Sequence, residues 1–213
     1  MQRLKMYQGG IYHICNKSIA NFGIFQNEFD AQRFRETIDY YNNIRVWTSF
    51  SNVLKKGTYE YSNIIYPKNV GIIKILSYCI MPDHYHLLIK VLTDAKISKY
   101  LNDIGNSYSR FFNVKHHRKG PLWQSSYRIK RIETNEQLLH VSRYIHLNPT
   151  TSQLVENPEE WKFSSYKDII SDKNVLHQLN EISIQSTTSF KKFVDDNKDH
   201  QIKLKQIKRL LLD

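Results

Sequence analysis

The stretch VGIIKILSYCIMPDHYHLLIKVL, residues 70–92, is the part of the chain that decides the fold. Two apolar runs rich in β-branched residues flank Pro82 and Asp83, a dipeptide typical of turns. We interpret the two runs as strands of an antiparallel hairpin in the centre of a sheet.

The segments before the hairpin predict one further strand and one helix. Residues 9–19 mix β-branched and aromatic residues in the manner of a strand. Residues 28–44 repeat apolar side chains at helical intervals, which predicts an amphipathic helix. Residues 45–69 have no clear period, so we expect either a short helix or a long loop there.

The segments after the hairpin predict two helices with a strand between them. A helix is expected over residues 96–117 and a strand over 121–132. Thr134 is a candidate N-cap for a helix that should run to about Leu147. Pro149 should end that helix, because the residue before a proline is disfavoured in the α region.

The predicted order is strand, helix, strand, strand, helix, strand, helix. This order predicts an α+β fold of the ferredoxin-like (split βαβ, RRM-like) type, a sandwich with a central antiparallel sheet and helices on one face. We expect residues 1–150 to form a catalytic domain and residues 151–213 to form a basic, helical C-terminal extension.

The charge of the chain favours a polyanionic partner. The formal net charge is +11, and residues 104–132 contain no acidic residue. Basic and aromatic residues alternate there, a combination that suits single-stranded nucleic acid, although a solvated basic face over core aromatics has the same pattern. The candidate DNA-binding residues are Arg110, Lys115, Arg118, Lys119, Trp123, Arg128, Lys130 and Arg131, interleaved with the aromatic residues Tyr108, Phe111, Phe112 and Tyr127.

Two histidines occupy alternate positions in the second strand of the hairpin. His84 and His86 should share one face of the strand, with Cα atoms roughly 6.6 Å apart. Two imidazoles at that spacing can converge on one divalent ion. The structural alternative is a pair of partly exposed histidines that pack under a helix.

The helix that follows Thr134 has a polar stripe beside its apolar one. Tyr144 and Asn148 belong to this stripe and lie one turn apart, about 6 Å along the axis. A tyrosine and an amide ligand that faced two histidines would form a metal-assisted nucleophile. Alternatively, Tyr144 is an amphipathic residue at a helix boundary and Asn148 merely ends the helix.

The motifs MPDHYHLLI, GPLWQSSYRIKRI, RYIHLNP and WKFSSY occur in this order. Over roughly residues 5–170, the chain therefore resembles the IS200-like single-tyrosine transposases, especially the REP-associated tyrosine transposases. Tyr85, between the two histidines, departs from the smaller hydrophobic residue usual in the family. Position 85 should face the apolar side of the strand, where this difference is tolerable.

The resemblance implies a mechanism and a set of functional residues. His84, His86 and Asn148 would bind the metal, and Tyr144 would be the nucleophile that forms a 5′-phosphotyrosine link and frees a 3′-OH. Mg²⁺ or Mn²⁺ suits this mixed nitrogen and oxygen ligand set better than Zn²⁺. The group that activates Tyr144 stays open between the metal, the basic surroundings and His140. The expected substrate is single-stranded DNA with hairpin structure.

The remaining expectations concern the setting of the protein and its alternatives. Cys15 and Cys79 are expected to be buried thiols in a reducing compartment. With no apolar run long enough to span a bilayer, we expect a soluble cytoplasmic protein that acts at the nucleoid, with a homodimer left open. The alternatives are a non-catalytic module that binds single-stranded nucleic acid, and a replication initiator or relaxase.

Overall fold

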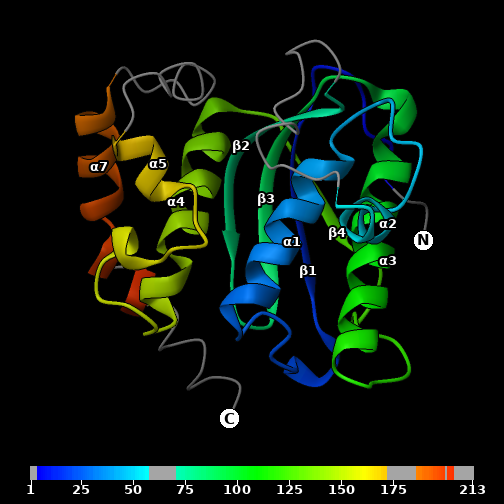
Figure 1. The fold of residues 1–213 in the computed structure, drawn as a ribbon. Helices are drawn as coiled ribbons and strands as arrows, with labels where there is room; N and C mark the ends of the chain where they lie inside the picture. Colours follow the sequence, from blue (N-terminus) through cyan, green and yellow to red (C-terminus); the bar gives the residue numbers. More distant parts are fainter. Residues whose placement is uncertain (1–3, 58–70, 172–185, 200, 204–213) are drawn as a thin grey trace.

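A four-stranded antiparallel sheet forms the centre of the molecule (Figure 1). The computed structural model describes residues 4–57, 71–171, 186–199 and 201–203. The spatial order of the strands is β2-β3-β1-β4. Their bounds are β1, Ile11–Lys17; β2, Ile73–Ile80; β3, His84–Val91; and β4, Arg128–Ile132.

Helices surround this sheet. The α-helices are α1, Glu28–Tyr41; α2, Phe50–Lys55; α3, Ile97–Lys115; α4, Asn135–Thr151; α5, Tyr166–Ser171; and α7, Thr187–Asp195. Within the ranges that the structure describes, there are also three short 3₁₀ helices: η1, Ile19–Asn21; η3, Asp94–Lys96; and η4, Pro158–Glu160.

The predicted α+β fold class and hairpin are confirmed. β2 and β3 pair in antiparallel fashion around the turn at Pro82 and Asp83. β3 is central in the sheet, but β2 lies at its edge, so the hairpin as a whole is not central. The strand expected over residues 121–132 is limited to its last five residues, those of β4.

The helices cover both faces of the sheet, which corrects the expectation of helices on one face. Tyr85, Leu87 and Ile89 of β3 pack in one core with residues of α1 and α3. Leu88 points the other way and packs in a second core with Leu138, a residue of α4. These two cores lie on opposite faces of β3. The helix α4 therefore stands on the opposite side of the sheet from α1 and α3 (Figure 1).

The helix α4 runs past its predicted end. Pro149 lies inside the helix, which continues to Thr151. Proline has no N–H, so the hydrogen bond that residue 149 would donate to the Ile145 carbonyl is absent. The amide of Ser152 closes the last turn by donating to the Asn148 carbonyl at 3.0 Å. Asn148 is therefore held in helical conformation, one turn after Tyr144.

Residues after α4 pack back onto that helix. Leu147 forms a third apolar cluster with Tyr166 and Ile169 of α5 and with Phe190 and Val194 of α7. Because α4 extends through Thr151, it crosses the expected boundary at 150/151, and the two-domain division stays a prediction. Residues 172–185, 200 and 204–213 of the expected basic, helical extension lie outside the described residues.

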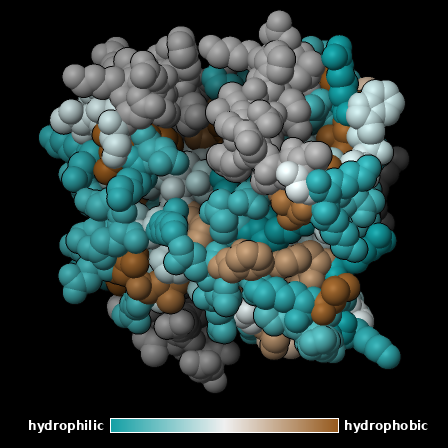
Figure 2. All heavy atoms as spheres, viewed as in Figure 1, coloured by the Kyte–Doolittle hydropathy of each residue, from teal (hydrophilic) through white to brown (hydrophobic). Residues whose placement is uncertain are grey.

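Hydrophilic residues dominate the molecular face in Figure 2, where apolar residues form small groups among them. Among the described residues, no helix is both long and apolar enough to cross a membrane. In the 45–69 segment the structure describes the short helix α2, while residues 58–70 lie outside the described ranges.

Candidate active site

A pocket of about 420 Å³ opens on the sheet face that carries α4. Its wall combines the two predicted histidines with the predicted nucleophile, so residues far apart in sequence meet there. The lining residues are His13, Cys15, Asn16, Lys17, His84, His86, Gln124, Ser125, Arg128 and Tyr144.

Strand register brings two unpredicted side chains into this pocket. Cys15 of β1 pairs directly with His86 of β3, and residues paired in this way share a face of the sheet. His13 lies two residues earlier in β1 and therefore shares that face. The alternation of His13 and Cys15 within the predicted strand was the signal that could have found them. Cys15 is only partly buried, contrary to expectation, whereas Cys79 is fully buried.

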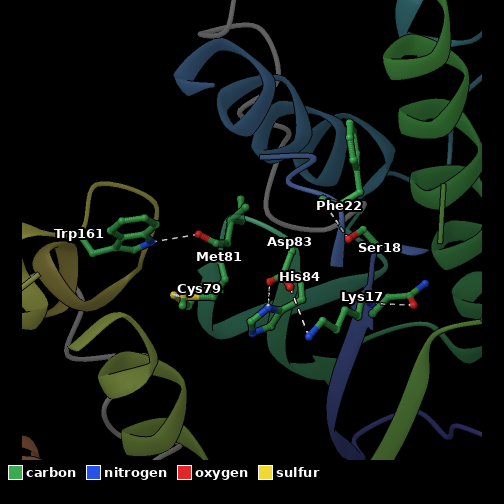
Figure 3. Close-up of polar contacts among 10 residues, drawn as sticks. Lys17, Ser18, Phe22, Cys79, Met81, Asp83, His84 and Trp161 are labelled. Atoms are coloured by element: carbon green, nitrogen blue, oxygen red, sulfur yellow. Dashed lines mark hydrogen bonds and ion pairs between the residues drawn. The ribbon is translucent and has the colours of Figure 1, made fainter. Parts of the chain in front are cut away.

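His84 is oriented by a carboxylate (Figure 3). Its Nδ1 lies 2.5 Å from Oδ1 of Asp83, and the other carboxylate oxygen lies 3.3 Å from Nζ of Lys17. Burial alone would raise the pKa of Asp83, but the hydrogen bonds and charges of His84 and Lys17 outweigh it and lower the pKa. A carboxylate on Nδ1 directs Nε2 of the imidazole toward a ligand, the arrangement common behind metal-binding histidines.

His86 is held by His13. Nδ1 of His86 and Nε2 of His13 lie 2.9 Å apart, and the two rings stack with centroids 5.1 Å apart. Burial, together with the nearby charge of Lys130, lowers the pKa of His13 to about 4. His13 is therefore neutral at neutral pH, and its hydrogen bond fixes the orientation of the His86 ring.

Tyr144 reaches the pocket from α4. Its ring stands edge-on to His86, with centroids 5.5 Å apart, and 42% of its surface is exposed. Burial of the side chain raises the pKa of Tyr144, and the nearby Asn148 side chain offsets part of that rise. Tyr144, a residue of the predicted polar stripe, thus lines the pocket and is accessible to a large substrate.

Asn148 is buried beside Tyr144, with 3% of its surface exposed, and does not line the pocket. Among the described residues, its amide Nδ2 has no hydrogen-bond partner. Nδ2 is a hydrogen-bond donor, whereas a cation would be bound by the amide oxygen Oδ1, so the unpaired donor is not itself a sign of a metal ligand. The oriented ring of His84 fits the metal set His84, His86 and Asn148, in which Asn148 would bind through its amide oxygen.

His140 does not belong to the pocket. Its Nδ1 accepts a hydrogen bond from the Arg143 guanidinium at 2.8 Å, and its Nε2 lies 3.7 Å from a Glu136 carboxylate oxygen. With both ring nitrogens engaged on the surface of α4, His140 is poorly placed to take a proton from Tyr144.

The predicted DNA-binding residues do not form one surface. Arg128 and Lys130 pair with Cys15 and His13, so both share the face of the pocket. Arg131 pairs with Tyr12, a residue of the opposite core, and therefore points away from the pocket. Arg110, Lys115, Arg118 and Lys119 belong to α3 or to the turn after it, on the far side of the sheet.

Two of these basic side chains, those of Lys115 and Arg118, bind other residues of the protein. Nζ of Lys115 lies 2.6 Å from Oδ1 of the buried Asp30. Arg118 donates to the Pro121 carbonyl at 2.8 Å and to the Asn113 side chain at 3.0 Å. Arg118 therefore holds the turn that follows α3.

The aromatic residues of the basic segment are mostly core residues. Tyr108 and Phe112 are buried, and the Tyr108 hydroxyl donates to the Ile24 carbonyl at 2.7 Å. Trp123 is partly buried, packs on that core and donates to the Gly105 carbonyl at 3.2 Å. The buried rings belong to the apolar core, which favours the alternative of a basic face over core aromatics, and base stacking by the partly buried rings stays a prediction.

The fold is that of the single-tyrosine transposases. A family model described as "Transposase IS200 like" matches residues 9–148. The chain therefore belongs to the IS200-like transposase family. The matched range includes all four strands and ends at Asn148, so it contains the pocket.

Two solved structures illustrate the likeness. A REP-associated tyrosine transposase bound to a REP hairpin is 17% identical, with a TM-score of 0.54, and the match covers 80% of this chain and 86% of that chain. A provisionally assigned transposase from Deinococcus radiodurans is 15% identical, with a TM-score of 0.37 and coverage of 68% and 95%. No curated protein matches the chain.

Proposed function

We propose that this chain cuts and rejoins single-stranded DNA at sites that contain hairpins, with Tyr144 as the nucleophile. The observation that carries the proposal is the convergence of Tyr144, His84 and His86 in one open pocket. The residues come from α4 and β3, and a polynucleotide strand could reach all three from the same side.

In the proposed reaction, the phenol oxygen of Tyr144 attacks the phosphorus of the scissile phosphodiester. A bond forms between the phosphorus and Tyr144, and the bond from phosphorus to the 3′ oxygen breaks. The phenol proton passes to a base, and the departing 3′ oxygen leaves as a hydroxyl. A second 3′-OH can attack the phosphotyrosine in reverse, so the covalent link conserves the bond energy needed for rejoining.

His84, His86 and Asn148 are the residues that would hold a divalent cation, and we propose Mg²⁺ or Mn²⁺. When bound, the cation would stabilise negative charge on the oxygens of the scissile phosphate. Asp83 and His13 orient the two imidazoles for that task. Arg128 and Lys130, on the same face, would attract the DNA backbone.

The REP hairpin bound by the solved relative supports a hairpin substrate. We also propose a homodimer, which light scattering of the purified protein would test. Compared with the non-catalytic alternative, the transposase proposal accounts for the histidine pair, and it does not need the core aromatics as a stacking platform.

The decisive variant is Tyr144→Phe, which removes one phenol oxygen. It should bind hairpin DNA as the wild type does and lose Mn²⁺-dependent cleavage by about 1,000-fold or more, because the nucleophile is gone. Tyr7→Phe is the matched control, since Tyr7 is similarly exposed, at 49%, and lies outside the pocket. Undiminished cleavage by Tyr144→Phe, measured on denaturing gels, would refute the assignment.

A further inference from the structure

A second set of metal-binding side chains lies in the same pocket. One ligand atom from each of His13, Cys15 and His86 lies within 4.8 Å of the other two. All three residues line the pocket, so an ion from solvent can reach them. Two strands hold them in register, because Cys15 is paired with His86 and His13 lies two residues before Cys15.

The chemistry of this set differs from that of the proposed catalytic set. A thiolate with two imidazoles selects Zn²⁺ and similar thiophilic ions, whereas Mg²⁺ and Mn²⁺ prefer oxygen ligands. Ligand atoms on one tetrahedral zinc ion are about 3.3–3.6 Å apart. The observed spread of up to 4.8 Å therefore closes with modest rotation of the side chains.

We propose that His13, Cys15 and His86 form a binding site for Zn²⁺ that competes with the catalytic metal for His86. Binding replaces the hydrogen bond between His13 and His86. The Cys15 thiol loses its proton to solvent as the zinc–sulfur bond forms, and each histidine binds through a ring nitrogen that carries no proton. Three protein ligands leave one position of the ion open to water or to phosphate.

Competition follows from the chemistry of His86. A neutral imidazole offers one lone pair for coordination, so His86 can serve one ion at a time. Zinc on the Cys15 side would thus remove one imidazole from the set His84, His86 and Asn148. This consequence rests on the proposed function, whereas the zinc site itself does not.

The site is tested by titrating the full-length, DNA-free protein with Co²⁺, a spectroscopic substitute for Zn²⁺. The wild type should develop a near-ultraviolet thiolate-to-cobalt charge-transfer band that added Zn²⁺ removes. Cys15→Ser should lose this band. Cys79→Ala, which alters the other, fully buried cysteine, should keep it, as should His84→Ala.

Several outcomes would overturn the site. These are the absence of the band in the wild type, its persistence in Cys15→Ser, or its loss in a Cys79→Ala protein whose circular dichroism is native. Cys15→Ala provides a second test of the thiolate if the serine variant does not fold.

Competition is tested separately by adding Zn²⁺ to cleavage reactions at fixed Mn²⁺. Zinc should inhibit the wild type, and Cys15→Ser should require more zinc for the same fractional loss. Equal inhibition of both proteins would overturn the competition. Complete absence of cleavage would instead count against the proposed function, and the cobalt spectra would still decide whether the zinc site exists.

Discussion

At the scale of single residues, the pocket depends on side chains that hold other side chains in place. His84 and His86 follow from a short motif that can be recognised in the sequence. His13 is separated from His86 by 73 positions, and only the pairing of β1 with β3 shows that the two rings meet. The histidine pair was found from the sequence, but the contact of His13 with His86 was not. The register between two strands that are distant in sequence cannot be deduced from the residues of either strand alone.

The Asp83 carboxylate gives a residue-scale prediction. Asp83→Ala removes the acceptor on Nδ1 of His84, so the ring should lose its fixed orientation and Mn²⁺ should bind about 10- to 100-fold more weakly. Asp83→Asn retains an oxygen that can accept the same hydrogen bond and should recover most of the affinity. Calorimetric titration measures both, with Asp94→Ala as an exposed control outside the pocket. Wild-type affinity in a folded Asp83→Ala protein would show that the carboxylate does not support a metal ligand.

At the scale of elements, the start of α4 was predicted correctly from the sequence, but its end was not. The N-cap at Thr134 and the spacing of Tyr144 from Asn148 were predicted and are found. The end of the helix was predicted wrongly, because the bias of the residue before a proline against the α region is outweighed in a last turn that packs against α5 and α7. That packing depends on segments after residue 160, which local patterns before Pro149 do not encode.

Thr134 gives a prediction for this element. Its side chain accepts a hydrogen bond from the Gln137 amide at 3.2 Å, which satisfies one of the free donors at the start of α4. Thr134→Ala should destabilise the protein by about 1 kcal/mol, as measured by urea unfolding. The control is Thr93→Ala, because Thr93 occupies the N-cap position of η3 without a side-chain capping bond. Equal losses in the two variants would mean that the cap of α4 contributes nothing specific.

At the scale of the whole molecule, a net charge of +11 indicates a polyanionic partner but does not locate it. The structure separates basic residues that are close in sequence. Arg128 lines the pocket and Lys130 lies on the same face of the sheet, while Arg131 faces the other side. Successive side chains of a strand point to opposite faces of the sheet. A run of basic residues within a strand therefore does not form one basic surface.

This division predicts how salt affects the binding of hairpin DNA. Arg128→Gln with Lys130→Gln should reduce the slope of log affinity against log salt by about 1.4, which corresponds to two lost phosphate contacts with single-stranded DNA. Arg110→Gln with Lys119→Gln removes the same charge from the far side and should leave the slope nearly unchanged. Titrations by fluorescence anisotropy over a salt series measure both slopes. A larger change in the second double variant would place the DNA on the α3 side.

The central claim is that Tyr144 becomes covalently joined to the DNA. Wild-type protein should be incubated with Mn²⁺ and a single-stranded hairpin oligonucleotide taken from the flanks of its own gene, then denatured and digested, and its peptides analysed by mass spectrometry. The account predicts a 5′-phosphonucleotide on the peptide that contains Tyr144 and a free 3′-OH on the released strand. An adduct on another tyrosine, such as Tyr127, or cleavage without any adduct would contradict it.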